Sequence, residues 1–352
     1  MFITGIGTAF PMQAYKQSEG WEAVQVAPQF SSLTPRARAI LRKVLTGNNG
    51  IDTRRLALDS LHDVFATGPD VLHARFARHA PRLAADAAAR ALHRSGLAPG
   101  RVDALIVSTC TGYLCPGLTS YVSELLGLRP DARLFDLVGQ GCGAALPNLS
   151  AGAALLDSGQ CAHVLSVCVE ICSAAFYLDN DPGVLVSACL FGDGAGAAVL
   201  AAKPRPGGRA IEWKTFHTHL VPGDRDLLRF EQKNGMLRNI LSPSVPALAA
   251  TYAESVVGAA LRDAGLGRDQ VKTWIWHAGG RDVLLALQDR LGLTPEDMRW
   301  SATVLRDFGN VSSPSVYFVL AEALAGNAPN GWWWMSSFGA GFSCHGALLN
   351  VA

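Results

Sequence analysis

The pattern of hydrophobic and polar positions changes near residue 80. Before that point polarity is mixed, which predicts irregular helices and loops. From residue 81 to 95, Ala, Leu and Arg recur at helical spacing, and the following GLAPG is typical of a helix end. Apolar segments then predict buried strands at residues 104–112 and 161–170, and a glycine-broken strand or hairpin at 190–202. This alternation of helices and apolar strands predicts an α/β fold.

The chain contains an internal repeat with an offset of 168 to 169 residues. Residues 91–108 read ALHRSGLAPGRVDALIVS, and residues 260–277 read ALRDAGLGRDQVKTWIWH. Two shorter similarities follow in the same order, namely GQGCGAA (139–145) with FGNVSS (308–313) and FGDGAGAAVL (191–200) with FGAGFSCHGALL (338–349). We infer two copies of one unit, built of helix, strand, turn, helix and glycine-rich hairpin.

Composition limits the size and the partners of these copies. A chain of 352 residues suits two units of about 150–200 residues, and the Pro/Gly-rich stretch 201–210 predicts halves 1–205 and 206–352. With 49% apolar and 17% charged residues, the chain can bury a large core and has little charge to cover its surface, so we expect a homodimer. The net charge of +1 argues against a protein that coats nucleic acid or anionic lipid.

Two further features bear on location and metals. The N-terminal MFITGIGTAF has neither a basic region nor a cleavage pattern, and no uncharged apolar run reaches about 18 residues, so we expect no signal peptide and no membrane span. The eight cysteines contain no CxxC pair, which argues against a zinc site or a secreted disulfide framework. We therefore expect a cytoplasmic protein with reduced thiols, no metal and no bound cofactor.

Cys142 is the candidate nucleophile. The Ala/Leu segment after it predicts a helix ending near Gly159, and Pro147 is tolerated only in the first turn of such a helix. The helix should therefore begin near residues 143–144, with Cys142 at its N-terminus, where the helix dipole favours a thiolate and lowers the pKa of the thiol. The alternative is an inert packed cysteine.

The repeat identifies two possible partners for Cys142. Asn310 occupies the position equivalent to Cys142, after a glycine and before a second helix, with Pro314 again in the first turn. His277 ends the repeated strand, before AGGR. If the two halves meet about a pseudo-twofold axis, Cys142, His277 and Asn310 lie together. The alternatives are a turn histidine and an ordinary N-cap asparagine.

This trio suits acyl transfer. An imidazolium beside Cys142 would hold the thiolate, and after acylation His277 and Asn310 could both donate hydrogen bonds to the carbonyl oxygen of a second thioester. That oxygen becomes an enolate when a β-carboxylate leaves as CO₂. A protease would instead need a base that deprotonates water, so the asparagine favours a decarboxylating condensation in a water-poor pocket.

The chain resembles the type III polyketide synthases, the chalcone-synthase-like branch of the thiolase fold. The resemblance runs from GIGTAFP at residue 5 to the C-terminus and rests on GQGCGAA, LFGDGAG, WHAGGRDVL, GNVSSPSV and FGAGF. It implies two duplicated αβαβα halves that form a five-layered α-β-α-β-α core. It also implies that Cys142 accepts a starter acyl group from acyl-CoA, and that His277 and Asn310 assist malonyl-CoA decarboxylation. Repeated condensation would build a poly-β-ketone that cyclises in the same cavity.

The resemblance also implies roles for substrate-binding residues. Phe191 matches the aromatic gate between the CoA tunnel and the cavity, and Ser312 matches a cavity serine. The remaining matches are Cys110 and Thr111 in the cavity wall, Cys115 reaching into the partner subunit's cavity, and Ala175 where cavity length is controlled. Basic residues near the first helices should meet the CoA phosphates, and Arg54 and Arg55 are the candidates.

Two departures from the family pattern bear on the product. The usual GFGPG is SFGAG here, with Ala340 in place of proline, and the second gate aromatic expected downstream of residues 234–239 has no counterpart. Together with the small side chains of Ala175 and Ser312, this predicts a roomy or tunnel-like cavity. We therefore favour a medium or long acyl starter and products of the alkylpyrone or alkylresorcinol type.

Three other functions are compatible with parts of the pattern. A condensing enzyme similar to ketoacyl-ACP synthase III would take its thioesters from a carrier protein. A non-catalytic partner subunit of a condensing heterodimer would be expected to lack the nucleophile, whereas Cys142, His277 and Asn310 are all present. A papain-like protease shares the trio but not the order of α/β units.

Overall fold

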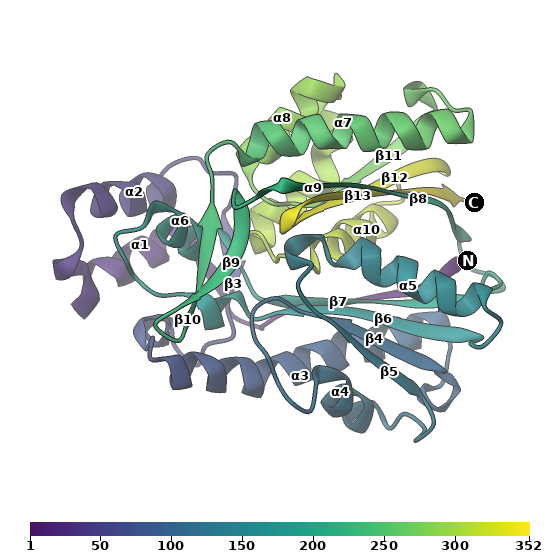
Figure 1. The fold of residues 1–352 in the computed structure, drawn as a ribbon, viewed down its shortest axis with the longest axis horizontal. Coiled ribbons are helices and arrows are strands. Elements are labelled where there is room, and N and C mark those ends of the chain that lie inside the picture. The colour runs from purple at the N-terminus through teal and green to yellow at the C-terminus, as the bar shows by residue number, and fades with distance from the viewer.

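The computed structural model describes residues 1–352, and its helices and strands form five layers. Figure 1 shows α7 and α8 above one half of a large sheet, α5 and α10 in the middle, and α3 and α4 below the other half of the sheet. These helices span Pro69–Ser95 (α3), Leu118–Leu126 (α4), Ala145–Asp157 (α5), Val245–Ala264 (α7), Arg281–Leu291 (α8) and Ser315–Ala325 (α10). The predicted five-layered α/β architecture is confirmed.

Nine strands form one mixed sheet in the order β11-β12-β13-β8-β1-β7-β6-β4-β5. They span Phe2–Ala9 (β1), Ala104–Ser108 (β4), Arg133–Leu137 (β5), His163–Glu170 (β6), Gly194–Ala201 (β7), Ile211–Arg225 (β8), Val271–Trp276 (β11), Gly331–Gly339 (β12) and Gly341–Val351 (β13). The two halves of the sheet join only through β1 and β8, at Phe2–Glu212 and Ile3–Ile211.

The strand order confirms the duplication. The series β1-β7-β6-β4 has the same pairing directions as β8-β13-β12-β11, antiparallel twice and then parallel. The repeated segments also match locally, because α3 and α7 both end at a left-handed glycine, Gly96 at φ 71° and Gly265 at φ 64°. Each glycine leads through a 3-10 turn into a strand, β4 or β11.

The middle layer couples the two halves. Helix α5 contacts β6 and β7 on one side and β12 and β13 on the other, while α10 contacts β1 and β7 as well as β11 and β12. Inside this layer Ser166 donates to Asn148 Oδ1 of α5 at 2.7 Å, and its hydroxyl lies 2.8 Å from that of Tyr317 in α10. These fully buried hydrogen bonds fix the two helices relative to each other.

The prediction of irregular helices and loops before residue 80 holds for the short helices between residues 17 and 65 but is wrong at both ends of this stretch. Strand β1 lies in the centre of the sheet, and α3 begins at Pro69 and continues through Pro81. The pattern misled because β1 carries Gly5 and Gly7, which weaken the signal of a strand. A Cβ at Gly7 would lie 2.0 Å from the carbonyl oxygen of Ala87, so the glycines allow α3 to pack closely on the strand.

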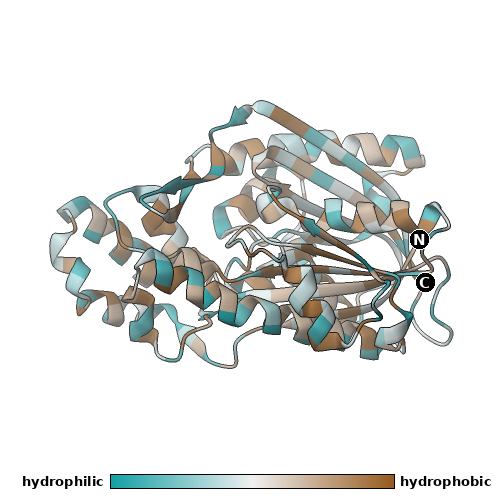
Figure 2. Cartoon of the chain, turned by 60° about the horizontal axis from the view of Figure 1, so that its bottom comes forward, coloured by the Kyte–Doolittle hydropathy of each residue, from teal (hydrophilic) through white to brown (hydrophobic).

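The remaining elements gather at one end of the layers, on the left in Figure 1. They are the short strands Ala14–Lys16 (β2) and Thr53–Arg55 (β3), the helices Gln17–Gln25 (α1), Pro35–Thr46 (α2) and Pro182–Leu190 (α6), and the hairpin of Leu228–Lys233 (β9) and Met236–Leu241 (β10). Helix α9 (Pro295–Phe308) packs beside α10. Figure 2 shows hydrophobic segments along the central strands and hydrophilic ones on the outer helices and loops. None of the helices combines the length and the apolar character needed to cross a bilayer.

Replacing Gly7 with Ala should destabilise the protein by at least about 3 kcal/mol, because the new methyl group meets helix backbone that cannot rotate away. Urea unfolding of both variants measures this. The matched control is Gly100→Ala, where a Cβ meets nothing within 4 Å, and which should change the free energy of unfolding by less than about 0.5 kcal/mol. Equal stability of the two variants would contradict the proposed close packing.

Candidate active site

Cys142 lies in a 3-10 turn, Gly141–Gly143, directly before α5, as the position of Pro147 predicts. The turn packs against the β12–β13 connection. A Cβ at Gly143 would lie 2.9 Å from Gly339 Cα, and one at Gly141 would lie 3.0 Å from Ala340 Cβ. The glycines on both sides of Cys142 are therefore required by close backbone contact, and Ala340, which departs from the family pattern, supports the back of this turn.

Asn310 begins the equivalent segment of the other half. Its backbone N–H donates to Leu190 O at 2.9 Å, and its carbonyl accepts from Gly192 at 3.0 Å, so it is fixed beside Phe191. Its side-chain Oδ1 accepts from the backbone N–H of Ser312 at 2.8 Å, which leaves Ser312 at a φ of 58°. Ser312 Oγ in turn donates to Cys142 Sγ at 3.1 Å.

His277 joins the same hydrogen-bonded chain through the glycines that follow it. Its backbone N–H donates to Ser336 O in β12 at 2.9 Å, and Asn310 Nδ2 donates to Gly279 O at 3.0 Å. A Cβ at Gly279 would lie 3.1 Å from His277 Nε2, so this glycine leaves room for the imidazole ring. The sequence elements that carry Cys142, Asn310 and His277 are thus linked in one network.

Burial dominates the electrostatics of the site. It raises the pKa of the Cys142 thiol to about 12, against the hydrogen bond from Ser312, which lowers it. It lowers the pKa of His277 to about 4, and His277 Nδ1 has no hydrogen-bond partner. The pKa of Cys142 is therefore raised, not lowered as predicted for a helix N-terminus, and burial is the largest cause. Both shifts favour the neutral form of the group.

A cavity of about 20 Å³ adjoins this network. Four residues predicted to bind substrate line it, namely Thr111, Ala175, Phe191 and Ser312, together with Cys172, Phe176, Ser187, Phe230 and Asn239. Phe230 is not among the residues that the sequence predicts to line the cavity. It lies upstream of residues 234–239, in β9 opposite Asn239, so a second aromatic does face the cavity. Only the hairpin register could have revealed it.

Cys110 faces the buried carboxylate of Glu170, which no sequence motif indicates. Glu170, at the end of β6, accepts hydrogen bonds from Cys110 Sγ at 3.3 Å and from Thr111 Oγ1 at 2.8 Å. Burial raises the pKa of Glu170, while Ser313 and the other donors lower it. The Cys110 sulfur also lies 3.6 Å from Ser312 Oγ, so a polar strip leads from Glu170 to the nucleophile. Cys115, by contrast, is exposed on this chain.

The two arginines predicted near the CoA phosphates are engaged within the protein. Arg54 is buried and donates to Gln17 Oε1, to Ala188 O and to Phe191 O. Arg55 donates to the carbonyls of Met12 and Pro11, and its guanidinium lies over the ring of Phe10. Arg54 is therefore held inside the protein, away from any phosphate in solvent, whereas Arg55 is only partly buried.

A second cavity, of about 50 Å³, lies between α1, α2 and α6. Its lining is almost entirely apolar and includes Leu41, Leu45, Leu56, Val64, Ala188 and Phe176. Phe176 is the residue that lines both this cavity and the one beside Cys142.

Ser312→Ala should slow the alkylation of Cys142 by iodoacetamide by about tenfold at pH 8, because loss of the hydrogen bond raises the pKa of the thiol further. In both proteins the rate should rise with pH up to at least pH 10. Mass spectrometry of the Cys142 peptide measures it. The control Ser313→Ala removes a hydroxyl that donates to Glu170 instead and should not slow the reaction. Equal slowing in both variants would contradict the role of Ser312.

Comparison with known proteins identifies the family. The profile described as chalcone and stilbene synthases, N-terminal domain, matches residues 2–204, and that of the C-terminal domain matches residues 214–351. A curated relative from Streptomyces toyocaensis, a 3,5-dihydroxyphenylacetyl-CoA synthase, is 34% identical over 332 residues, covering 90% of this chain and 80% of the relative. The synthase of the same name from Amycolatopsis balhimycina is 32% identical over 326 residues, covering 90% and 83%.

Solved structures agree in fold over the whole chain. PKS-I from the brown alga Ectocarpus siliculosus superposes with a TM-score of 0.90 at 26% identity, covering 99% of this chain and 98% of that one. The 1,3,6,8-tetrahydroxynaphthalene synthase of Streptomyces coelicolor, a bacterial type III polyketide synthase, superposes with a TM-score of 0.88 at 23% identity, covering 99% of each chain. With both family profiles matched in order along nearly all of its length, the chain belongs to the chalcone and stilbene synthases, the type III polyketide synthases.

Proposed function

We propose that Cys142, His277 and Asn310 carry out the decarboxylating Claisen condensation of this family. The observation that supports it is the buried network from Gly279, next to His277, through Asn310 and Ser312 to the Cys142 sulfur. Cys142 attacks the thioester carbonyl of a starter acyl-CoA, and the carbon–sulfur bond to CoA breaks. Because the thiol is neutral at rest, its proton moves to His277 during the attack and then to the leaving CoA thiolate.

The second half-reaction uses the same donors. Malonyl-CoA loses CO₂, and the electron pair of the broken carbon–carbon bond moves into the thioester to form an enolate. Asn310 has a second Nδ2–H beyond the one given to Gly279, and a neutral imidazole keeps one N–H, so both can donate to the enolate oxygen. The enolate carbon then attacks the carbonyl carbon of the acyl group on Cys142. The carbon–sulfur bond to Cys142 breaks, and the Cys142 sulfur leaves as a thiolate. A pocket with little water favours loss of the carboxylate as CO₂.

For the starter we propose a medium or long acyl chain, giving products of the alkylpyrone or alkylresorcinol type. The small side chain of Ala175 and the apolar lining of the second cavity, which shares Phe176 with the first, support an aliphatic chain. The names of the curated relatives support a second candidate, a dihydroxylated aromatic acyl-CoA product. Domain halves at 1–205 and 206–352 and a cytoplasmic location remain our proposals, the latter supported by eight free cysteines.

Incubation with malonyl-CoA and a panel of starter CoAs, followed by mass analysis, tests this assignment. We expect condensation products with fatty acyl-CoAs of medium length and an acyl adduct on Cys142. Cys142→Ala should abolish the adduct and lower product formation by at least about 10³-fold. Full product formation by that variant would refute the mechanism. Activity with aromatic CoAs and none with fatty acyl-CoAs would refute the proposed starter.

The same assay separates the competing functions. A condensing enzyme that depends on a carrier protein would give no product with free malonyl-CoA and would become active only when malonyl-loaded carrier is added. A non-catalytic partner subunit would show no acyl adduct under either condition. Turnover with free malonyl-CoA and the chain alone therefore contradicts both alternatives.

We further propose that the protein is a homodimer that associates through β5. This strand pairs only with β4, and Leu134, Phe135, Val138 and the nearby Tyr113 and Leu125 are exposed apolar side chains. An exposed apolar edge strand is a ready site for pairing with a second copy. The exposed Cys115 lies in the loop that follows β4, which supports its proposed reach into the partner subunit.

Phe135→Asp should convert the dimer into a monomer, because it puts a charge into the apolar interface. Analytical ultracentrifugation measures the mass. The matched control is Leu285→Asp, an exposed apolar residue on α8 away from this edge, which should remain dimeric. A monomeric unmodified protein, or a dimeric Phe135→Asp variant, would contradict the proposed interface.

A further inference from the structure

One face of the β9–β10 hairpin lines the cavity, and the other face carries charged side chains. Phe230 and Asn239 are directly paired, and both line the cavity beside Cys142. Their neighbours Glu231 and Arg238 are also directly paired and lie on the opposite face, since side chains alternate along a strand. The inner face therefore forms a cavity wall, and the outer face carries charge.

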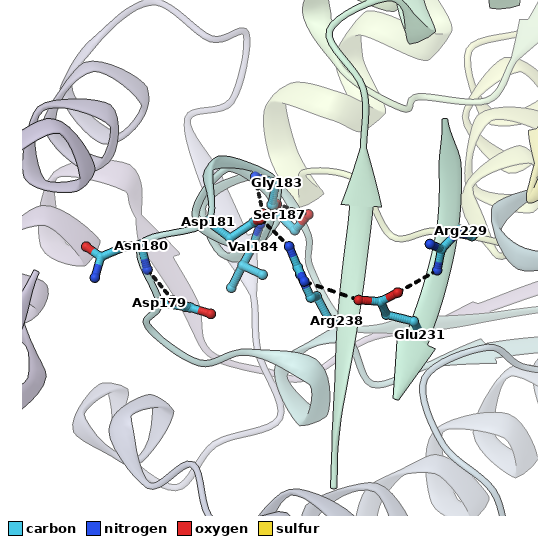
Figure 3. A network of polar contacts seen from close by, with 9 residues as sticks. All are labelled: Asp179, Asn180, Asp181, Gly183, Val184, Ser187, Arg229, Glu231 and Arg238. Atoms are coloured by element: carbon cyan, nitrogen blue, oxygen red, sulfur yellow. Dashed lines mark hydrogen bonds and ion pairs between the residues drawn. The ribbon is translucent and has the colours of Figure 1, made fainter. Parts of the chain in front are cut away.

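The outer face is attached to helix α6 by a line of ion pairs. Figure 3 shows Arg238 between Asp181 and Glu231, with Arg229 beyond Glu231. Arg238 Nη1 lies 3.2 Å from Glu231 Oε1, its Nη2 donates to Asp181 Oδ2, and Arg229 Nη1 lies 2.7 Å from Glu231 Oε2. The side chains of Arg238 and Asp181 are only 21% and 27% exposed, so solvent and salt screen this pair incompletely.

Asp181 has a second role as the N-cap of α6. Its Oδ1 accepts from the backbone N–H groups of Gly183 at 2.9 Å and Val184 at 3.3 Å. Burial alone would raise the pKa of Asp181, but Arg238 and these N–H groups lower it below its usual value, which keeps the carboxylate charged. Arg238 is thus bound to the group that starts the helix.

Helix α6 connects this ion pair to the gate aromatic. Phe191 is the C-cap residue of α6, and its backbone N–H donates to Ser187 O at 3.1 Å. Asn239 of the hairpin donates to Ser187 Oγ at 2.7 Å. The hairpin is therefore held to α6 at its first turn and at its middle, while α6 carries Phe191 and the hairpin carries Phe230. The gap between the two rings depends on how these elements dock.

We propose that Arg238 is a positioning residue that sets the width of the opening between Phe191 and Phe230 and thereby selects the starter. Phe191 and Phe230 line the same cavity of about 20 Å³, so a hairpin held against α6 keeps this cavity small, which favours an unbranched acyl chain over branched or cyclic groups. This inference rests on the proposed function, because it concerns the starter that reaches Cys142.

The test compares cyclohexanoyl-CoA with hexanoyl-CoA as starters for the full-length enzyme. In Arg238→Gln the ratio of kcat/KM for the cyclic over the linear starter should rise about tenfold, as expected when a pocket loses a steric limit. Asp181→Asn should give the same shift, because Asn keeps the N-cap and removes only the charge. Malonyl-CoA decarboxylation should change by less than about twofold in both variants, since its donors are untouched.

Arg229→Gln is the matched control. It removes an arginine from the same line of charges, but Arg229 contacts Glu231 and Asp226 and does not reach α6, so the starter ratio should stay unchanged. An unchanged ratio in Asp181→Asn, or an equal shift in Arg229→Gln, would overturn the role of Arg238. Absence of condensation with every starter in the unmodified enzyme would instead contradict the proposed function.

Discussion

The hydrogen bond from Ser312 to the Cys142 sulfur is the point at which the two halves of the chain become one site. Cys142 precedes the first helix of the middle layer, and Ser312 precedes the second. For this 3.1 Å contact to form, α5 and α10 must begin at the same place, which requires the buried bonds of Ser166 to Asn148 and Tyr317. It also requires the glycines around Cys142, because any side chain there would push away the β12–β13 connection.

Burial is the consequence of that arrangement, and it determines the kind of chemistry. Burial raises the pKa of the Cys142 thiol to about 12 and lowers that of His277 to about 4, so enclosure favours the neutral form of each group. A neutral imidazole and an amide remain good hydrogen-bond donors, however, and they cost less to bury than a charged pair. The enclosure that makes Cys142 a weak nucleophile at rest also favours loss of a carboxylate as CO₂.

The sequence predicts the positions of Cys142, His277 and Asn310 along the fold better than it predicts the residues that line the cavity. The repeat placed Cys142 and Asn310 before equivalent helices and His277 after a strand, because helix starts, prolines and glycines leave local signals. Phe230 and Glu170 left none, since a lone aromatic in a hairpin and a lone acid at a strand end acquire meaning only from register and packing. Arg54 shows the opposite error: its charge suggested a phosphate site, whereas burial among backbone carbonyls makes it structural. Strand β1 was missed because its glycines serve the packing of α3.

The two halves of the chain differ mainly in the segments that line the cavities, not in the strands and helices that carry Cys142, His277 and Asn310. In each half the first strand, β1 or β8, is followed by an extra segment before the first long helix, α3 or α7: residues 10–68 in one case and the β9–β10 hairpin in the other. Both segments lie at the same end of the molecule (Figure 1). The second cavity is lined by α1 and α2 from the first segment, and the first cavity by the hairpin from the second. These insertions differ in size and charge between the halves, whereas the strands of the two halves pair in the same order and directions. A duplicated core can thus keep one chemistry while the insertions, held to it by a few side chains, determine which acyl groups fit.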